Sequence, residues 1–157
     1  MSILNKQPGW NNTTKLLWDI ASNTKKLAKS FLNGFIIIPD ETATKGTTAY
    51  RLISTASVNL TVVKASKGNL YSISAISIAD EITYLKLYNL NVEPTVNDIP
   101  LMTIPIPTNA AGAGVVIPFL IGVNFTNGIS FKITKNVADN DNTPIEANNV
   151  ILNLTYA

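Results

Sequence analysis

The chain has no cysteine and no histidine among its 157 residues. Without cysteine there are no disulfide bonds, thiolate nucleophiles or cysteine metal sites. Without histidine the chain lacks the commonest general base near neutral pH and the commonest metal ligand. These absences exclude Ser-His-Asp and Cys-His catalysis and zinc sites with two histidines. An enzyme would have to use Asp, Glu, Lys, Tyr or hydroxyl groups, so we expect a protein that is not an enzyme and has no cofactor.

Charged residues are also scarce, at 14% of the chain, and the formal net charge is only +2. A charge this small does not by itself predict a nucleic-acid partner. The basic excess lies in the first third, where six lysines outnumber Asp19, Asp40 and Glu41. No apolar run approaches the roughly 20 residues that span a bilayer, and Phe35–Ile38 is too short for a signal peptide. We therefore expect a soluble, non-secreted chain that binds neither membrane nor nucleic acid.

From residue 48 onward, short segments of alternating apolar and polar residues are separated by turn residues, which is typical of an all-β protein. The expected strands are Tyr50–Ser54, Val58–Lys64, Leu70–Ile78, Ile82–Leu90, Leu101–Ile106, Val115–Val123, a strand from Ile129, and Val150–Tyr156. Eight antiparallel strands in two sheets are the number found in a jelly roll. The pattern therefore favours a jelly-roll-like β-sandwich over residues 48–157, although other sandwiches have similar strand numbers.

Three local features refine this prediction. Asn127-Gly128 lies between two apolar segments and predicts a hairpin with a type I′ turn. Pro100, Pro105 and Pro107, in and around the fifth expected strand, cannot donate to a ladder, so this segment should be an edge strand or a strand end. In Ile82–Leu90 the apolar residues alternate with Tyr84, Lys86 and Tyr88, which predicts a half-buried strand.

The first 47 residues follow a different pattern and predict an N-terminal arm. Residues 13–33 have apolar side chains at helical spacing, and Gly34 follows where a helix C-cap is expected. This amphipathic helix could pack on a partner or on the sandwich, or the arm could be weakly ordered until assembly. We expect the arm to engage a neighbouring subunit. The partner-binding residues would be Leu17, Ile20, Lys25, Lys26, Leu27 and Phe31.

Other candidate sites have simpler explanations. Residues 139–143 alternate oxygen-bearing side chains as calcium loops do, but Pro144 and Val150 occupy the positions where an EF-hand needs Gly and Glu. Asp80 and Glu81 are adjacent, so they should point to opposite faces, as expected of a turn rather than an acid–base pair. Gly112 and Gly114 lack the lysine and the helix of a phosphate-binding loop. We predict no catalytic, cofactor-binding or metal-binding residues here.

Tyrosines form a further candidate group, because Tyr71, Tyr84 and Tyr88 could together provide a stacking platform for a sugar. Packing between neighbouring strands explains them equally well.

Several segments resemble virion proteins of tailed bacteriophages. The similar segments follow one another in order along the β region: residues 50–54, 63–66 with Gly68 and Tyr71, 84–89, 94–96, 102–107, 112–114 and 149–156. The resemblance covers residues 48–157 and leaves the first 47 residues uncovered. It implies a small β-sandwich component of the phage head or neck, often a decoration or cement subunit, without catalysis or cofactor.

The expected function is therefore a capsid decoration or cement subunit in the virion, assembled in the host cytoplasm, that bridges the major capsid or other head proteins. Because oligomers are usually symmetric, we expect a homo-oligomer, with a trimer favoured. The alternative is a head-fibre or adhesin-type module, anchored to the virion by residues 1–47, whose sandwich binds a host surface. A carbohydrate-active enzyme using two carboxylates is the third hypothesis, and its acids would include Asp139 or Asp141.

Overall fold

A computed structural model describes residues 16–25, 46–108 and 111–157. The chain divides into two units, Met1–Ile38 and Pro39–Ala157. In the first unit, residues 16–25 form a helix. The rest of the expected helix, residues 13–15 and 26–33, lies outside the described residues, as do most residues of the expected arm.

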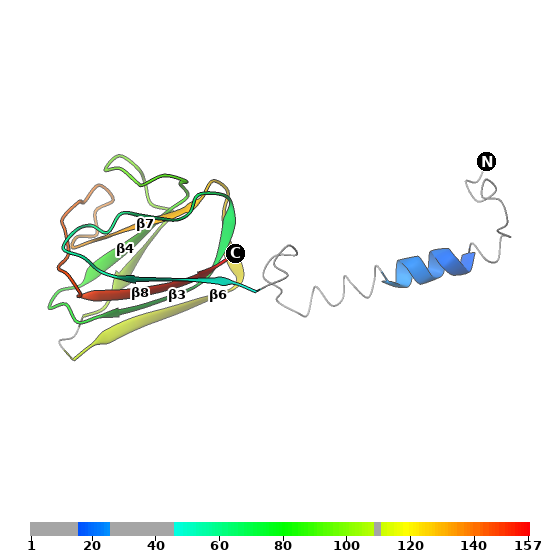
Figure 1. Ribbon diagram of the computed structural model, residues 1–157, viewed down its shortest axis with the longest axis horizontal. Coiled ribbons are helices and arrows are strands. Elements are labelled where there is room, and N and C mark those ends of the chain that lie inside the picture. Colours follow the sequence, from blue (N-terminus) through cyan, green and yellow to red (C-terminus); the bar gives the residue numbers. More distant parts are fainter. Residues whose placement is uncertain (1–15, 26–45, 109–110) are drawn as a thin grey trace. The chain divides into compact units, whose positions relative to one another are not determined.

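The second unit contains eight strands, whose bounds agree closely with those expected from the alternation of apolar and polar residues (Figure 1). The strands are β1 (Thr48–Ile53), β2 (Thr61–Lys64), β3 (Gly68–Ser77), β4 (Thr83–Tyr88), β5 (Met102–Ile106), β6 (Ala113–Phe125), β7 (Ile129–Thr134) and β8 (Val150–Tyr156).

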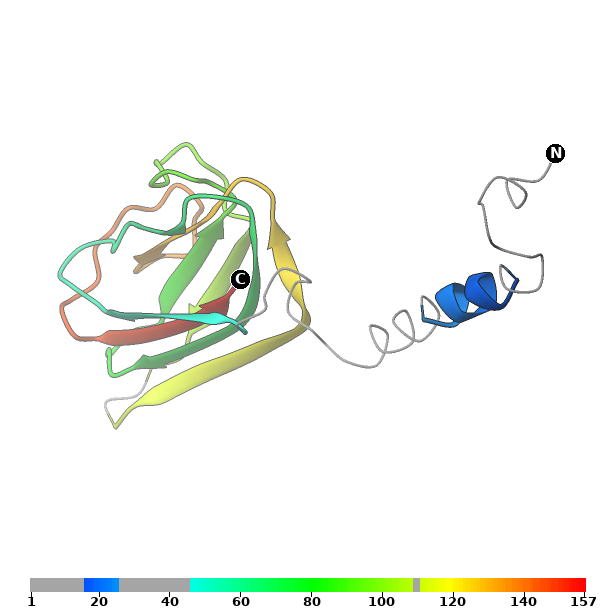
Figure 2. The same ribbon diagram turned by 45° about the vertical axis from the view of Figure 1, so that its right-hand side comes forward.

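These strands form two four-stranded antiparallel sheets, sheet A in the order β1-β8-β3-β6 and sheet B in the order β2-β7-β4-β5 (Figures 1 and 2). Every step from one strand to the next crosses to the opposite sheet, except the step from β4 to β5, which stays in sheet B. This double-sheet arrangement is that of a jelly roll, so the expected fold class is confirmed. The proline-containing β5 lies at an edge of sheet B, as predicted.

The core lies between the sheets and is made of the inward residues of both. It includes Leu70 and Ile73 of β3, Leu85 and Leu87 of β4, and Phe131 of β7, none of which is exposed. The Phe131 ring meets the Tyr50 ring edge to face, with centroids 6.0 Å apart and the ring planes at 69°. Alternation with a period of two places Leu85 and Leu87 on one face of β4. Leu70 and Ile73 are three residues apart, and both reach the core because the register of β3 shifts between Leu70 and Ser72.

The predicted hairpin at Asn127-Gly128 is wrong, because β6 and β7 belong to different sheets. Neither residue has a positive φ, so no type I′ turn forms. The segment is a corner held by Asn89, whose side-chain oxygen accepts the Asn127 backbone N–H at 2.8 Å. Glycine is needed at position 128 for close approach, since an added Cβ would lie 2.7 Å from the backbone oxygens of Lys64 and Leu90.

The second expected strand begins later than predicted, at Thr61. Its first part is a turn in which Asn59 has a φ of 51° and accepts the Thr55 backbone N–H on its side-chain oxygen at 2.8 Å. Asparagine tolerates this left-handed conformation and bonds to nearby backbone, so it replaces the ladder with a local turn.

Candidate functional site

The helix at residues 16–25 exposes its apolar side chains. Of the predicted partner-binding residues it contains Leu17, Ile20 and Lys25, and the two apolar ones are more than half exposed. Lys26, Leu27 and Phe31 lie outside the described residues. An isolated helix of this length is marginal in water, so its stability depends on packing against something else. The helix therefore provides an apolar surface suited to a partner.

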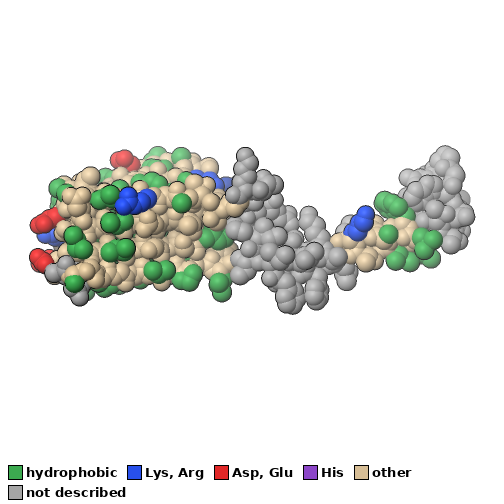
Figure 3. Space-filling model, turned by 60° about the horizontal axis from the view of Figure 1, so that its bottom comes forward, with side chains coloured by type: hydrophobic (Ala, Val, Ile, Leu, Met, Phe, Trp, Pro, Cys, Tyr) green, Lys and Arg blue, Asp and Glu red, His purple; other side chains and the backbone are tan. Residues whose placement is uncertain are grey.

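Most side chains on the outer face of sheet A are apolar or are polar without a charge. Ile53, Ile151 and Ile76 are aligned across β1, β8 and β3 and point away from the core. In another row, Thr155 and Ser72 join their hydroxyls at 2.7 Å. Arg51 is the charged residue among the strand residues of sheet A. Figure 3, seen from this side, shows hydrophobic side chains spread among uncharged ones.

Strand β6 is the longest of the four strands that form sheet edges. Natural sheets protect free edges by keeping them short or by adding charges, prolines or bulges. β2 has four residues with a lysine and a register shift, β5 has five with a proline, and β1 contains Arg51. β6 has thirteen residues and no charge, and its protection consists of Pro118 and a register shift against β3 between Pro118 and Val123. Figure 2 shows it along the border of sheet A.

Large apolar side chains of β6 point into solvent. Val116 is 72% exposed, Leu120 is 70% exposed and Ile121 is 88% exposed. Single exposed apolar residues are ordinary, but three on one uncharged edge strand are typical of a surface that another protein covers. We define Val116, Leu120 and Ile121 as the β6 patch.

A glycine shapes this strand next to the patch. Gly122 has a φ of +78°, and an added Cβ would lie 2.9 Å from Cε1 of Tyr71. The ring of Tyr71 thus lies close against the backbone of β6, near a register shift in β3.

We expect Gly122→Ala to lower the free energy of unfolding by about 1–2 kcal/mol, because the left-handed conformation disfavours a Cβ and the ring must move. Chemical denaturation measures this loss. Gly46→Ala is the matched control, since Gly46 has a φ of +79° but nothing within 4 Å of an added Cβ. Equal losses in the two variants would show that the Tyr71 contact contributes nothing.

The outer face of sheet B contains buried charges, which corrects the prediction that the strand around Lys86 is half-buried. Lys86 of β4 and Lys132 of β7 are directly opposite in register, and neither is exposed. The connections at residues 89–101 and 135–149 lie on this side of the sheet (Figure 1). Nζ of Lys86 donates to the backbone oxygen of Ala138 in the second connection. Nζ of Lys132 finds no hydrogen-bond partner in the part of the chain that the structure describes, and it lies 5.8 Å from the centroid of the Tyr88 ring.

Burial changes the titration of this group, which we call the lysine pair. Desolvation lowers the pKa of both Lys86 and Lys132, and for Lys86 the neighbouring ammonium lowers it further. Asp139 and Asp141 act in the opposite direction on both lysines. Desolvation also raises the pKa of Tyr88 to about 12. No described residue forms a hydrogen bond with the Tyr88 hydroxyl or with that of Ser130.

Residues 136–143, which include the oxygen-bearing residues 139–143, form a hydrogen-bonded turn above the lysine pair. Oδ1 of Asp141 accepts from the Thr143 hydroxyl at 2.7 Å and from the Asn136 amide at 3.0 Å, and Oδ2 accepts from the Asn136 backbone N–H. Both carboxylate oxygens are thus engaged within the loop. Among the described residues, no three Asp or Glu side chains are grouped so that they could hold a metal ion.

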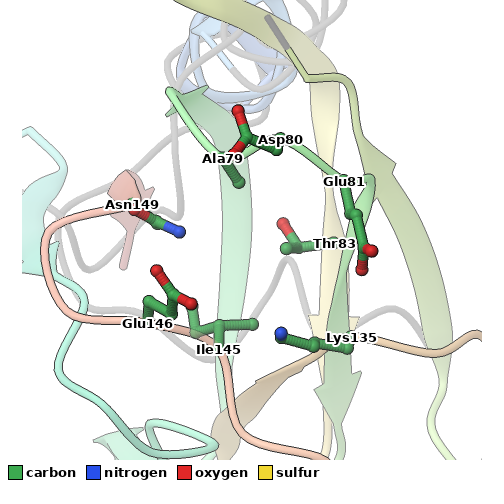
Figure 4. A pocket seen from close by; sticks show the side chains of 8 residues that line it. All are labelled: Ala79, Asp80, Glu81, Thr83, Lys135, Ile145, Glu146 and Asn149. Atoms are coloured by element: carbon green, nitrogen blue, oxygen red, sulfur yellow. The ribbon is translucent and has the colours of Figure 1, made fainter. Parts of the chain in front are cut away.

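A polar pocket of about 150 Å³ lies between two connections that cross from one sheet to the other (Figure 4). The β3–β4 side provides Ala79, Asp80, Glu81 and Thr83. The β7–β8 side provides Lys135, Ile145, Glu146 and Asn149. From the sequence, Asp80 and Glu81 had no third carboxylate near them. In the fold they line the same pocket as Glu146.

Backbone hydrogen bonds hold the walls of the pocket together. The Ile78 N–H donates to the Asn149 carbonyl at 3.0 Å, which joins the two connections. The Ser54 hydroxyl donates to the Glu146 carbonyl at 3.1 Å and accepts from the Val150 N–H at 3.0 Å. The pocket is therefore formed by fixed backbone rather than by long side chains alone.

The three tyrosines considered as a stacking platform do not come together. Tyr71 lies on β3 in sheet A, whereas Tyr84 and Tyr88 lie on β4 in sheet B. Tyr88 is also fully buried. The structure therefore favours the packing explanation for these residues.

Comparison of the chain with models of known protein families, with curated proteins and with solved structures finds no match. Within the described residues, no helix is long and apolar enough to cross a membrane.

Proposed function

We propose that this chain is a structural subunit of a tailed-phage particle, a capsid decoration or cement protein that bridges head proteins. The observation that supports this best is the β6 patch, three exposed apolar side chains on a long, uncharged edge strand of a jelly-roll sheet. The exposed apolar helix at residues 16–25 provides a second contact surface on the arm. When many copies each bind through two such surfaces, the overall affinity for the head is high even if no single contact is a deep pocket.

The proposed subunit acts as a homo-oligomer, with a trimer favoured. Cyclic symmetry lets one surface of each copy meet a different surface of its neighbour and closes the ring.

Particles of the phage that encodes the chain test this function. Heads made without the protein should lose tolerance to heat and low salt, and added protein should restore it at a fixed number of copies per head. Ile121→Glu should weaken binding to heads by about tenfold or more, because a carboxylate would be buried at the contact. Since Ile121 is 88% exposed, this variant should fold normally.

Val92→Glu is the matched control, because Val92 is an exposed valine in the β4–β5 connection. It should bind heads like the unaltered chain. Heads that are equally stable without the protein, or that do not bind it, would contradict the cement function.

A second candidate function is a head-fibre or adhesin-type module, and the position of the pocket favours it. Thr48, where the arm joins the sandwich, is paired with Tyr156 at one end of sheet A. Asn149 of the pocket precedes β8 at the opposite end. A chain anchored through its arm would thus present the pocket at the far end. Binding of residues 1–157 to host cells rather than to heads distinguishes this function from the first.

A further inference from the structure

We infer that the pocket between the β3–β4 and β7–β8 connections binds a neutral, hydroxyl-rich ligand the size of one sugar residue. This inference deepens the second candidate function and rests on it, because it names the chemistry of the surface that would be bound.

A buried hydroxyl without a partner indicates a ligand here. Thr83 is 2% exposed, and its Oγ1 has no hydrogen-bond partner among the described residues. Figure 4 shows this hydroxyl directed into the pocket. A buried polar group without a partner is unfavourable and requires an explanation, such as a bound molecule that supplies the missing hydrogen bond.

The polar side chains around Thr83 are also free to bind. Those of Lys135, Glu146 and Asn149 make no hydrogen bond or ion pair with another described residue. Lys135 can only donate, Glu146 can only accept, and Thr83 and Asn149 can do both. A hydroxyl group donates and accepts at once, so a ligand with several hydroxyls matches this mixture better than an ion of either sign.

Size and charge narrow the ligand further. A pocket of about 150 Å³ is comparable with cavities that hold one six-membered ring. The lining has three acids, Asp80, Glu81 and Glu146, against one lysine, which disfavours anionic sugars. There is no aromatic residue in the lining to stack on a ring, so we expect millimolar affinity for one residue, increased by many copies on a particle.

Nuclear magnetic resonance titration of the full chain tests the inference. The probes are methyl glycosides of glucose, galactose, mannose and N-acetylglucosamine, with glucuronate as an anion and N-acetylarginine amide as a cation. At least one neutral glycoside should shift the amide signals of residues 79–83 and 145–149, and glucuronate should not. Thr83→Val should weaken that binding about tenfold or more without lowering the melting temperature, since the lost hydroxyl has no partner in the free protein.

Thr103→Val is the matched control, because Thr103 lies on β5 away from the pocket, and it should leave binding unchanged. The inference is overturned if no neutral glycoside shifts these signals up to its solubility limit, or if Thr83→Val binds equally well. Shifts caused by N-acetylarginine amide alone would also overturn it and assign the pocket to a basic side chain of a protein. Binding to host cells and binding to heads are measured separately. A chain that binds host cells but no neutral glycoside would therefore overturn this inference and leave the second candidate function standing.

Discussion

Replacing Lys132 with methionine is expected to raise the free energy of unfolding by about 2 kcal/mol at pH 7. Lys132 is fully buried, its ammonium has no hydrogen-bond partner, and Lys86 lies directly opposite. Substituting a buried charge with a hydrophobic side chain of similar length removes the desolvation cost and the repulsion. Tyr88, 5.8 Å away, would then pack against an apolar chain.

The pH profile gives this prediction a second readout. Because the folded pKa of each lysine lies below 10.5, the unfolded chain binds more protons between the two values, so stability rises with pH in that window. Above pH 10 the trend reverses, because the pKa of Tyr88 is raised to about 12 and the unfolded chain loses its proton first. In Lys132→Met, the rise of the free energy of unfolding with pH below pH 10 should be smaller, and its decrease above pH 10 should remain.

Urea denaturation at a series of pH values measures both effects. Lys67→Met is the control, since Lys67 is exposed, and it should change stability by less than about 0.5 kcal/mol. A loss of stability in Lys132→Met at pH 7 would mean that the ammonium has a stabilising partner, such as Asp98, Asp139 or a bound anion.

The second large effect is on stability at low pH, and it depends on Asp141. Asp141→Asn should cost about 2 kcal/mol at pH 7, because the carboxylate is more stable in the folded chain. Partial burial raises the pKa of Asp141, but hydrogen bonds from Asn136 and Thr143 together outweigh it and lower the pKa to about 2. The stability is therefore present above about pH 4 and lost as the pH falls toward 2.

The measurement is the free energy of unfolding between pH 7 and pH 2. The unaltered chain should lose stability below pH 4, and Asp141→Asn should lose markedly less. The remaining loss includes Asp98, whose pKa is lowered by hydrogen bonds from the backbone and side chain of Thr95. Asp80→Asn is the control, because the Asp80 side chain makes no hydrogen bond with a described residue. An unchanged acid profile in Asp141→Asn would show that the 136–143 turn contributes little to stability.

These two predictions depend on features that sequence reasoning missed. Lys86 alternates with Leu85 and Leu87, and alternation ordinarily puts a lysine in solvent. Its burial results from the connections at 89–101 and 135–149 folding over the outer face of sheet B. Where a long connection lies is decided by contacts with distant residues, and local pattern contains no signal for it.

The Asn127-Gly128 corner is a second case in which a local sequence pattern did not predict the tertiary structure. The dipeptide is a strong local signal for a hairpin, but β6 and β7 pair with other strands. Packing of the whole sandwich outweighed the local preference of two residues. Glycine is still required there, because the backbones of Leu90 and Lys64 approach it closely.

The sequence by itself determined the absence of cysteine and histidine chemistry, the low charge, the strand positions and the edge position of β5. These properties follow from residue type and from a period of two, which are local. Only the tertiary structure decided which strands share a sheet, that β6 is a free apolar edge, that two lysines are buried together, and that Thr83 and Glu146 line one pocket. Each of these results from contacts between residues far apart along the chain, which depend on how the two sheets pack.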